Sequence, residues 1–513
     1  RKIFARAHHQ SVVERRMAPQ LSVKLIDNQD AAFWIKINSV TSDKELKCEI
    51  DHHELGKNAK IFQKKIPITA LAPVLVSMIH LSIALIGPYS PVLALIIVFF
   101  ELPSLRLVVL GFFTLWLYIS FLHDQLLSFN HAKLTARLKP GLYTNASNLK
   151  RNIISNVPSF RYPYYKGTPW LLTGDLLTIF SYLLFTYPSV EYTRRWMNVP
   201  KAEGSNAKYF ENGFKTDDLD HDHPIALDFA VPPTGHNPSK PLYIILHGLN
   251  GGSSEAYVLG VVWEALNRGS SVCVMLARGL GDSSSTDALF HAARISDVTT
   301  VVNKLHNCLG TATPLALVGF SIGGIIASNY LGILGSNCPL KAAVSLAGSF
   351  DVRANAYSGH SLRAWQPILA FDLKRNFLLP NIHRMERRGV DVNLALRLAS
   401  VVDFDTSVVV PYHGYSDLLE YYEDMSAGCK GKHLKIDVPL LAVQALDDPV
   451  MNSNGLPIND VEVNRNLWFL LTKRGGHIGW AEGWFPWSNK FRWMSCTSLD
   501  FCEAIIKEKI DLH

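Results

Sequence analysis

The chain has 513 residues, 48% hydrophobic and 18% charged, which suits a large folded domain with an appendage and excludes a disordered chain. Its formal net charge of +6 comes from scattered basic residues without a nucleic-acid-binding module, so we expect no nucleic-acid partner. The seven cysteines lack metal-ligand spacing, and their odd number argues against a disulfide framework, so we expect a reducing compartment for the main domain.

The first third of the chain has a polar part and an apolar part. Residues 1–65 are polar and mixed in character, and they contain no recognisable chemistry. Residues 66–86 carry no charge and are long enough to cross about 30 Å of hydrocarbon. After a Pro/Gly turn, residues 92–122 are interrupted only by Glu101, Pro103 and Arg106. We therefore predict a membrane-embedded helical hairpin over residues 66–122, with two buried core helices of a soluble domain as the weaker alternative.

Basic residues suggest how this hairpin is oriented. Lysines precede the first span and basic residues follow the second, so the positive-inside rule places both ends in the cytosol. The domain that follows the linker at 123–160 would then be cytosolic, whereas a single span would place it in the lumen. A further apolar stretch, 171–187, is short, contains Asp175 and ends at Pro188. We expect that stretch to be buried or interfacial rather than spanning.

Residues 161–513 predict a large α/β domain. Short apolar runs alternate with amphipathic stretches, which is typical of a mostly parallel sheet with helices on both faces. The expected strands are 225–231, 241–246, 271–276, 314–318, 340–346, 438–444 and 466–472. The expected helices are 254–267, 292–308 and 324–332. His223 and Asp228 fit an H-x-x-x-x-D pattern of some acyltransferases, but they straddle the start of a strand, so we interpret that match as coincidence.

A glycine-rich loop, His247-Gly-Leu-Asn-Gly-Gly-Ser253, directly follows the strand at 241–246. Because glycines let the backbone approach a ligand closely, the N–H of Leu249 is our candidate for one donor to an oxyanion. The alternative is an ordinary strand-to-helix loop, and the spacing fits neither G-x-G-x-x-G nor a P-loop.

The segment Gly319-Phe-Ser-Ile-Gly323 matches G-x-S-x-G, in which a serine occupies a sharp turn between a strand and a helix. Glycines are needed because this turn leaves no room for side chains beside the serine. The apolar run before the segment and the helical stretch after it supply the context that so short a pattern requires. We predict Ser321 as a nucleophile and the N–H of Ile322 as a second oxyanion donor, against the alternative of a turn without chemistry.

The alternation of strands and helices stops between residues 351 and 437. This insertion contains aromatic and charged helical pieces, including 365–377 and 390–402. Because it follows the strand beside the nucleophile, we predict a helical cap over the site.

An acid and an imidazole follow the last two strands. Asp447 and Asp448 come directly after one strand, at the sheet edge where α/β proteins bind ligands, and His477 lies among glycines after the next. The order Ser, Asp, His is that of the α/β-hydrolase fold. We expect His477 to take the proton of Ser321 as the serine attacks an acyl carbonyl, while the carboxylate stabilises the imidazolium. This mechanism uses no metal and no cofactor.

These motifs resemble the α/β-hydrolase-domain family of membrane-anchored esterases and lipases, which is related to embryogenesis-associated plant hydrolases and bacterial esterases. The matching segments are 168–180, 246–253, 277–279, 319–324, 329–332, 419–422, 447–449 and 475–479. The resemblance implies a triad in which the second aspartate, Asp448, is the acid, with Asp447 as the alternative. It also implies lipid-ester substrates and an N-terminal membrane anchor. The chain departs from the family's GHLQT-like run at 174–178, where it has Gly-Asp-Leu-Leu-Thr.

The leading hypothesis is a membrane-anchored serine hydrolase whose partners are an acyl-ester substrate, such as a lipid, and the bilayer. An acyltransferase would use the same triad with an alcohol in place of water. A scaffold protein on this fold would be catalytically silent. The complete set of triad residues favours an enzyme.

Overall fold

The computed structural model describes residues 138–148, 153–199, 223–280, 283, 289–356 and 358–511. The polar segment at 1–65 and the predicted membrane hairpin at 66–122 lie outside these residues. Within the described part of the chain, no helix has both the length and the apolar character needed to cross a membrane. The stretch at 171–187 contains an 11-residue helix, α8 (Gly174–Leu184).

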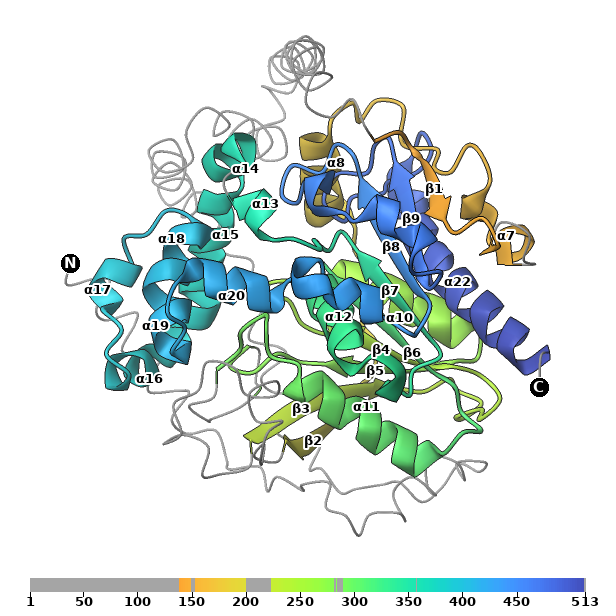
Figure 1. Ribbon diagram of the computed structural model, residues 1–513, viewed down its shortest axis with the longest axis horizontal. Coiled ribbons are helices and arrows are strands. Elements are labelled where there is room, and N and C mark those ends of the chain that lie inside the picture. The colour runs from red at the N-terminus through yellow and green to blue at the C-terminus, as the bar shows by residue number, and fades with distance from the viewer. Residues whose placement is uncertain are drawn as a thin grey trace, which may run out of the picture.

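A nine-stranded, mostly parallel sheet lies at the centre of the domain, in the order β1-β9-β8-β7-β6-β4-β5-β3-β2 (Figure 1). Its strands are β1 (Gly141–Thr144), β2 (Thr193–Val199), β3 (His223–Ala230), β4 (Leu242–Leu246), β5 (Ser271–Met275), β6 (Leu315–Phe320), β7 (Ala342–Leu346), β8 (Leu440–Ala445) and β9 (Leu467–Thr472). The six strands from β5 to β9 across the sheet pair in parallel. Antiparallel pairs join β1 to β9, β3 to β5 and β2 to β3 at the two edges.

The central strands are apolar because helices cover both faces of the sheet. Every residue of β4, β5, β6 and β7 is buried, as expected for parallel strands between two helical layers. The predicted mostly parallel sheet is thus confirmed. Two edge strands were not predicted. One of them, β1, lies within the segment interpreted as a linker at 123–160, and four residues are too few to show a periodic pattern.

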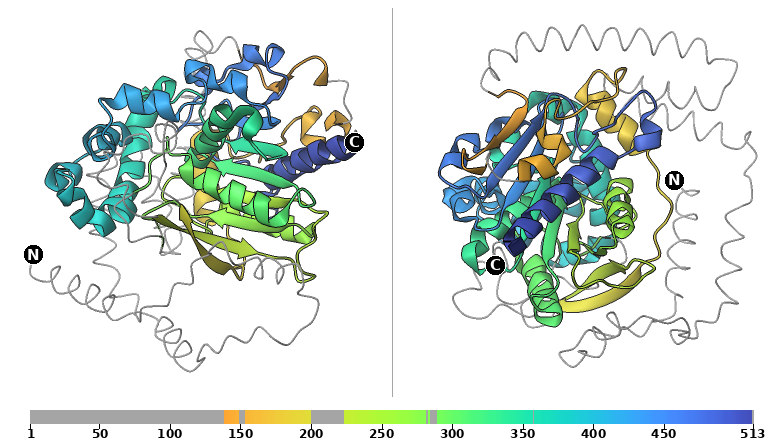
Figure 2. Two further views of the ribbon diagram at one scale, coloured as in Figure 1. Left: turned by 60° about the horizontal axis from the view of Figure 1, so that its bottom comes forward. Right: turned by 90° about the vertical axis from the view of Figure 1, so that its right-hand side faces the viewer.

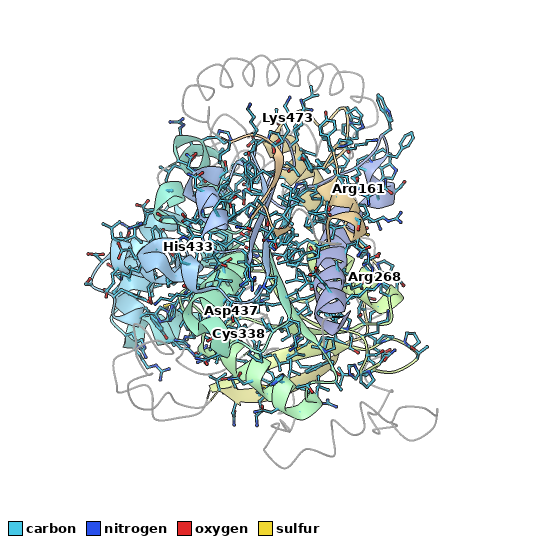
Figure 3. All side chains as sticks on the ribbon, turned by 45° about the vertical axis from the view of Figure 1, so that its right-hand side comes forward. Arg161, Arg268, Cys338, His433, Asp437 and Lys473 are labelled. Carbon is cyan, nitrogen blue, oxygen red and sulfur yellow. The ribbon has the colours of Figure 1, made fainter. Side chains whose placement is uncertain are left out.

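Two pairs of helices cover the faces of the sheet (Figure 2). Residues of α10 (Ala256–Asn267) and α22 (Arg492–Asp511) share one buried cluster with one side of the strands. Residues of α11 (Ser296–Leu309) and α12 (Ile322–Leu334) share a second cluster with the other side. Arg268, labelled in Figure 3, lies beside α22 and pairs with Asp500 at 2.7 Å, which ties α10 to α22. The short helices α7 (Ile153–Asn156) and α21 (Pro486–Asn489) complete this part of the domain.

A group of helices between β7 and β8 forms the cap, at the left of the sheet in Figure 1. They are α13 (Arg353–Ala356), α14 (Gly359–Ala364), α15 (Gln366–Leu373), α16 (Ile382–Arg387), α17 (Val392–Ala395), α18 (Val401–Phe404), α19 (Val410–His413) and α20 (Leu418–Met425). The single helix predicted at 390–402 is wrong. Asp391 and Ser400 each accept a hydrogen bond from the backbone three residues later, so each starts a separate short helix.

Candidate active site

Ser321 occupies a sharp turn between β6 and α12 at the carboxyl edge of the sheet. Its φ angle of 51° lies in the left-handed region, and its N–H donates to the carbonyl of Leu346 at 2.8 Å. A Cβ atom on Gly323 would lie 2.4 Å from the carbonyl oxygen of Leu246, and one on Gly319 would lie 2.3 Å from that of Gly323. The glycines of the G-x-S-x-G segment are therefore required by the close approach of β4, β6 and α12.

The three predicted triad residues form one hydrogen-bonded chain. His477 Nε2 lies 2.9 Å from Ser321 Oγ, and His477 Nδ1 lies 2.9 Å from Asp448 Oδ2. The other carboxylate oxygen, Oδ1, accepts from the backbone N–H groups of Val450 and Met451, both at 2.8 Å. The Asp448 side chain is completely buried, and these donors fix its orientation toward the imidazole.

Asp447, the alternative acid, has a different position. Its Oδ1 accepts from the N–H of Gly476 at 2.9 Å, and so it holds the loop that carries the histidine. Thr178 on α8 holds the same loop, since its Oγ1 accepts from the N–H of His477 at 2.8 Å and donates to the carbonyl of Gly174. The imidazole is thus positioned through its backbone by two side chains as well as through Asp448.

The two residues predicted to supply oxyanion donors meet at the nucleophile. Leu249 and Ile322 line the same buried cavity as Ser321 and His477. Ile322 is the first residue of α12, so its N–H has no acceptor within the helix. Tyr257 Oη accepts from the N–H of Gly248 at 2.9 Å. This hydrogen bond uses the N–H group that directly precedes that of Leu249 in the loop.

Sequence reasoning missed two residues that hold the site in place. Tyr257 packs its ring against Phe320, with ring centroids 4.9 Å apart, directly behind the nucleophile. His247 is neutral because burial lowers its pKa, and its Nε2 accepts from the N–H of Ala277 at 3.0 Å. It therefore ties the glycine-rich loop to the end of β5. For Thr178 a weak signal existed, because after the glycine only Leu176 and Thr178 match the GHLQT-like run.

The departure from that run has a structural consequence. Asp175 of α8 accepts from Trp365 Nε1 at 2.7 Å and lies 2.8 Å from His360 Nε2, and both partners belong to the cap. The hydrogen bond to Asp175 raises the pKa of His360. The helix that positions His477 is therefore also tethered to the cap.

Other candidate features lie apart from this site. Asp228 of β3 pairs with Arg194 at 2.7 Å and accepts from Ser253 Oγ at 2.6 Å. Its partners therefore give it a structural role, separate from the triad.

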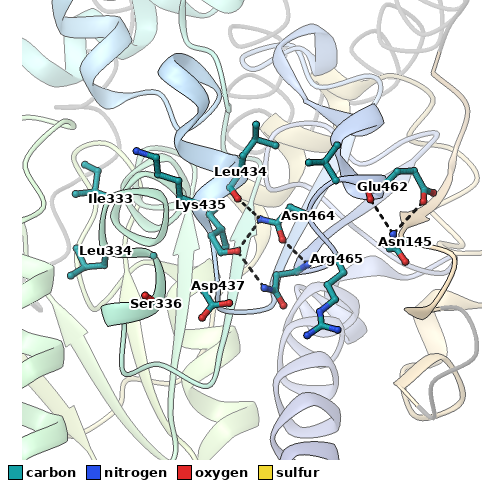
Figure 4. A pocket seen from close by; sticks show the side chains of 14 residues that line it. Asn145, Ile333, Leu334, Ser336, Leu434, Lys435, Asp437, Glu462, Asn464 and Arg465 are labelled. Carbon is teal, nitrogen blue, oxygen red and sulfur yellow. Dashed lines mark hydrogen bonds between the residues drawn. The ribbon is translucent and has the colours of Figure 1, made fainter.

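A surface pocket of about 740 Å³ lies before the amino ends of β8 and β9, where Asn464 donates to the carbonyl of Ile436 (Figure 4). This pocket is on the sheet edge opposite to Ser321. Among the described residues, no cluster of His, Cys, Asp or Glu side chains could hold a metal ion.

Comparisons with known proteins agree with this fold. Residues 241–478 match the alpha/beta hydrolase fold family. The chain has the α/β-hydrolase fold. The human phospholipase ABHD3 is 26% identical over 379 residues, which cover 73% of this chain and 87% of the relative. The embryogenesis-associated protein EMB8 of Picea glauca is 26% identical over 373 residues, covering 70% and 76%. The resemblance to these hydrolases that was noted from the sequence is thus confirmed, and the membrane anchor that it implied is not tested by these matches.

A third relative shares a shorter region with this chain. The monoacylglycerol lipase of Saccharomyces cerevisiae is 31% identical over 260 residues, covering 49% of this chain and 57% of the relative. All three matches therefore place this chain among proteins that share the fold.

Proposed function

We propose that this α/β-hydrolase cleaves carboxylic esters, in particular acyl esters of lipids, with Ser321, His477 and Asp448 as its catalytic triad. The observation that carries the proposal is the hydrogen-bonded chain from the carboxylate through the imidazole to the serine. The names of two relatives, a phospholipase and a monoacylglycerol lipase, support an acyl-ester substrate. The largely apolar cavity above the serine supports a hydrocarbon chain as the acyl group.

The proposed reaction has two stages. Ser321 Oγ attacks the ester carbonyl while His477 Nε2 takes its proton, and the N–H groups of Leu249 and Ile322 stabilise the oxyanion. The imidazolium, stabilised by Asp448, then protonates the departing alcohol, which leaves an acyl-enzyme. A water molecule deprotonated by His477 attacks the acyl-enzyme, and release of the carboxylic acid restores the serine.

Labelling with a fluorophosphonate tests this assignment, because only an activated serine reacts rapidly with the probe. We expect the detergent-extracted wild-type chain to be labelled and the Ser321→Ala variant not to be. Ser328→Ala removes another serine hydroxyl of α12 and should keep the labelling, because its Oγ bonds the carbonyl of Gly324 rather than an imidazole. Labelling that persists in Ser321→Ala, or a folded wild type that never reacts, would contradict the proposal.

We also propose that residues 66–122 anchor the protein in a membrane with the α/β domain in the cytosol. The length of the two apolar segments and the basic residues beside them support this arrangement. After an alkaline carbonate wash, the full chain should remain with the membranes, and a C-terminal tag should be digested by protease without detergent. Release of the chain by carbonate would contradict the membrane anchor. A tag that is protected from protease until detergent is added would contradict the cytosolic orientation.

A further inference from the structure

The cavity above Ser321 is mostly apolar, with a few polar side chains in its wall. Its volume is about 120 Å³, and its apolar lining includes Phe290, Ile325, Leu369, Leu373, Phe377 and Val401. Among the polar residues of the wall, Asn355 and Gln366 are occupied by hydrogen bonds within the protein. His291 and Asp405 differ, as does Asn250 of the glycine-rich loop, because within the described part of the chain each retains hydrogen-bonding capacity that no neighbouring group uses.

His291 is 1% exposed, and neither of its ring nitrogens has a hydrogen-bond partner among the described residues. Its ring contacts are aromatic, with the centroid of His413 at 4.3 Å and that of Tyr421 at 6.3 Å. Burial, and next the nearby His413, Arg294 and Arg278, lower its pKa well below the ordinary value. The imidazole is therefore neutral at pH 7 and offers one donor and one acceptor.

Asp405 lies on a turn of π-helix, Asp405–Val409, which follows α18 in the cap. Within the described part of the chain its carboxyl group has one hydrogen bond, in which Tyr422 Oη donates to Oδ2 at 3.0 Å. Burial raises the pKa of this carboxyl group to about 7, so near neutral pH it both donates and accepts.

Neighbouring tyrosines connect His291 to Asp405 along the wall of the cavity. Tyr421 packs against the imidazole, and its ring also contacts Tyr422, the partner of Asp405, at 5.6 Å between centroids. Tyr421 Oη in turn accepts from the N–H of Ala292, the residue after His291. The wall of the cavity therefore contains, besides Ser321 and His477, two linked residues with unused hydrogen-bonding capacity.

We infer that His291 and Asp405 bind a hydroxyl group carried by the acyl chain of the substrate, so that the enzyme prefers hydroxyacyl esters. This inference rests on the proposed ester hydrolysis. A hydroxyl is neutral and supplies one donor and two acceptor positions, which matches a neutral imidazole and a carboxyl group in the wall of one cavity. A cationic group would meet the guanidinium of Arg294 near the imidazole, and a carboxylate would meet Asp405. The apolar remainder of the wall suits the hydrocarbon of the same acyl chain.

The experiment compares 4-nitrophenyl octanoate with a series of 4-nitrophenyl hydroxyoctanoates that differ in the position of the hydroxyl. We expect kcat/KM of the wild type to be at least about 10-fold higher for one hydroxy isomer than for the plain ester. Asp405→Leu and His291→Leu should remove that preference, because each lowers kcat/KM for the favoured hydroxy isomer more than for the plain ester. Thr406→Val removes a hydroxyl from the same turn, bonded to the carbonyl of Val402, and should keep the preference.

The outcomes separate this inference from the proposed function. If the wild type hydrolyses all the esters without preference, the inference is wrong and the ester hydrolase stands. Equal losses on both esters in the two variants would also overturn it, because they indicate a structural role. If the wild type hydrolyses none of the esters and resists the fluorophosphonate, the proposed function fails first. The wild-type comparison needs no variant, so poor folding of Asp405→Leu or His291→Leu cannot hide the answer.

Discussion

Replacing Asp448 by asparagine is expected to lower kcat/KM for a 4-nitrophenyl ester by about 10⁴-fold. Asp448 Oδ2 lies 2.9 Å from His477 Nδ1, where an ionised oxygen accepts the ring proton. An amide of the same shape presents either an N–H or a weaker acceptor, so the imidazole loses the tautomer that leaves Nε2 free for the serine proton. Kinetics of the purified variant, with unfolding monitored beside them, measure the effect.

The neighbouring carboxylate provides the matched control. Asparagine at position 447 still has a side-chain oxygen that can accept from the N–H of Gly476, the contact that Asp447 makes. We therefore expect Asp447→Asn to retain activity within about 10-fold of the wild type, since a conserved neutral hydrogen bond loses little. A larger loss of kcat/KM in Asp447→Asn than in Asp448→Asn would mean that Asp447, not Asp448, is the acid of the triad.

The residues that the sequence singled out meet because each follows a buried parallel strand directly. Such strands are recognisable as short apolar runs, and their carboxyl ends share one edge of the sheet. Ser321, Asp448 and His477 are therefore brought together by topology alone, once the strands are assigned. The same reasoning placed Leu249 and Ile322 at the cavity, because one follows β4 and the other opens the helix after β6.

Other parts of the site depend on contacts between distant segments, which no local pattern reveals. Thr178 bonds the backbone of His477 from a helix 299 residues earlier in the chain. Tyr257 lies only nine residues after Gly248, on α10, but no spacing in the sequence marks it as the partner of the glycine-rich loop. In the cap, the side-chain caps Asp391 and Ser400 override a stretch whose composition suits one longer helix. Hydrophobic pattern thus predicts the scaffold better than the polar contacts that adjust it.

Asp297→Asn is expected to destabilise the domain by about 3–5 kcal/mol. Arg278, which follows β5 in the matching segment 277–279, has a fully buried side chain, and its Nε donates to Asp297 Oδ2 at 2.9 Å. A second bond joins its other nitrogen to Oδ1 of the same carboxylate. Without the carboxylate charge, the guanidinium remains in a low-dielectric interior without compensation. Urea unfolding of the full chain in detergent measures the loss.

A surface pair gives the comparison for this prediction. Arg353 is bonded to Asp351 at 2.9 Å with its side chain 38% exposed, so Arg353→Met should cost less than about 1 kcal/mol. The double variant Arg278→Met with Asp297→Leu should recover most of the stability lost in Asp297→Asn, because it removes both buried charges together. Recovery would mean that the pair joins β5 to α11 without adding net stability. A double variant as unstable as the single one would mean that the hydrogen bonds themselves hold the two elements together.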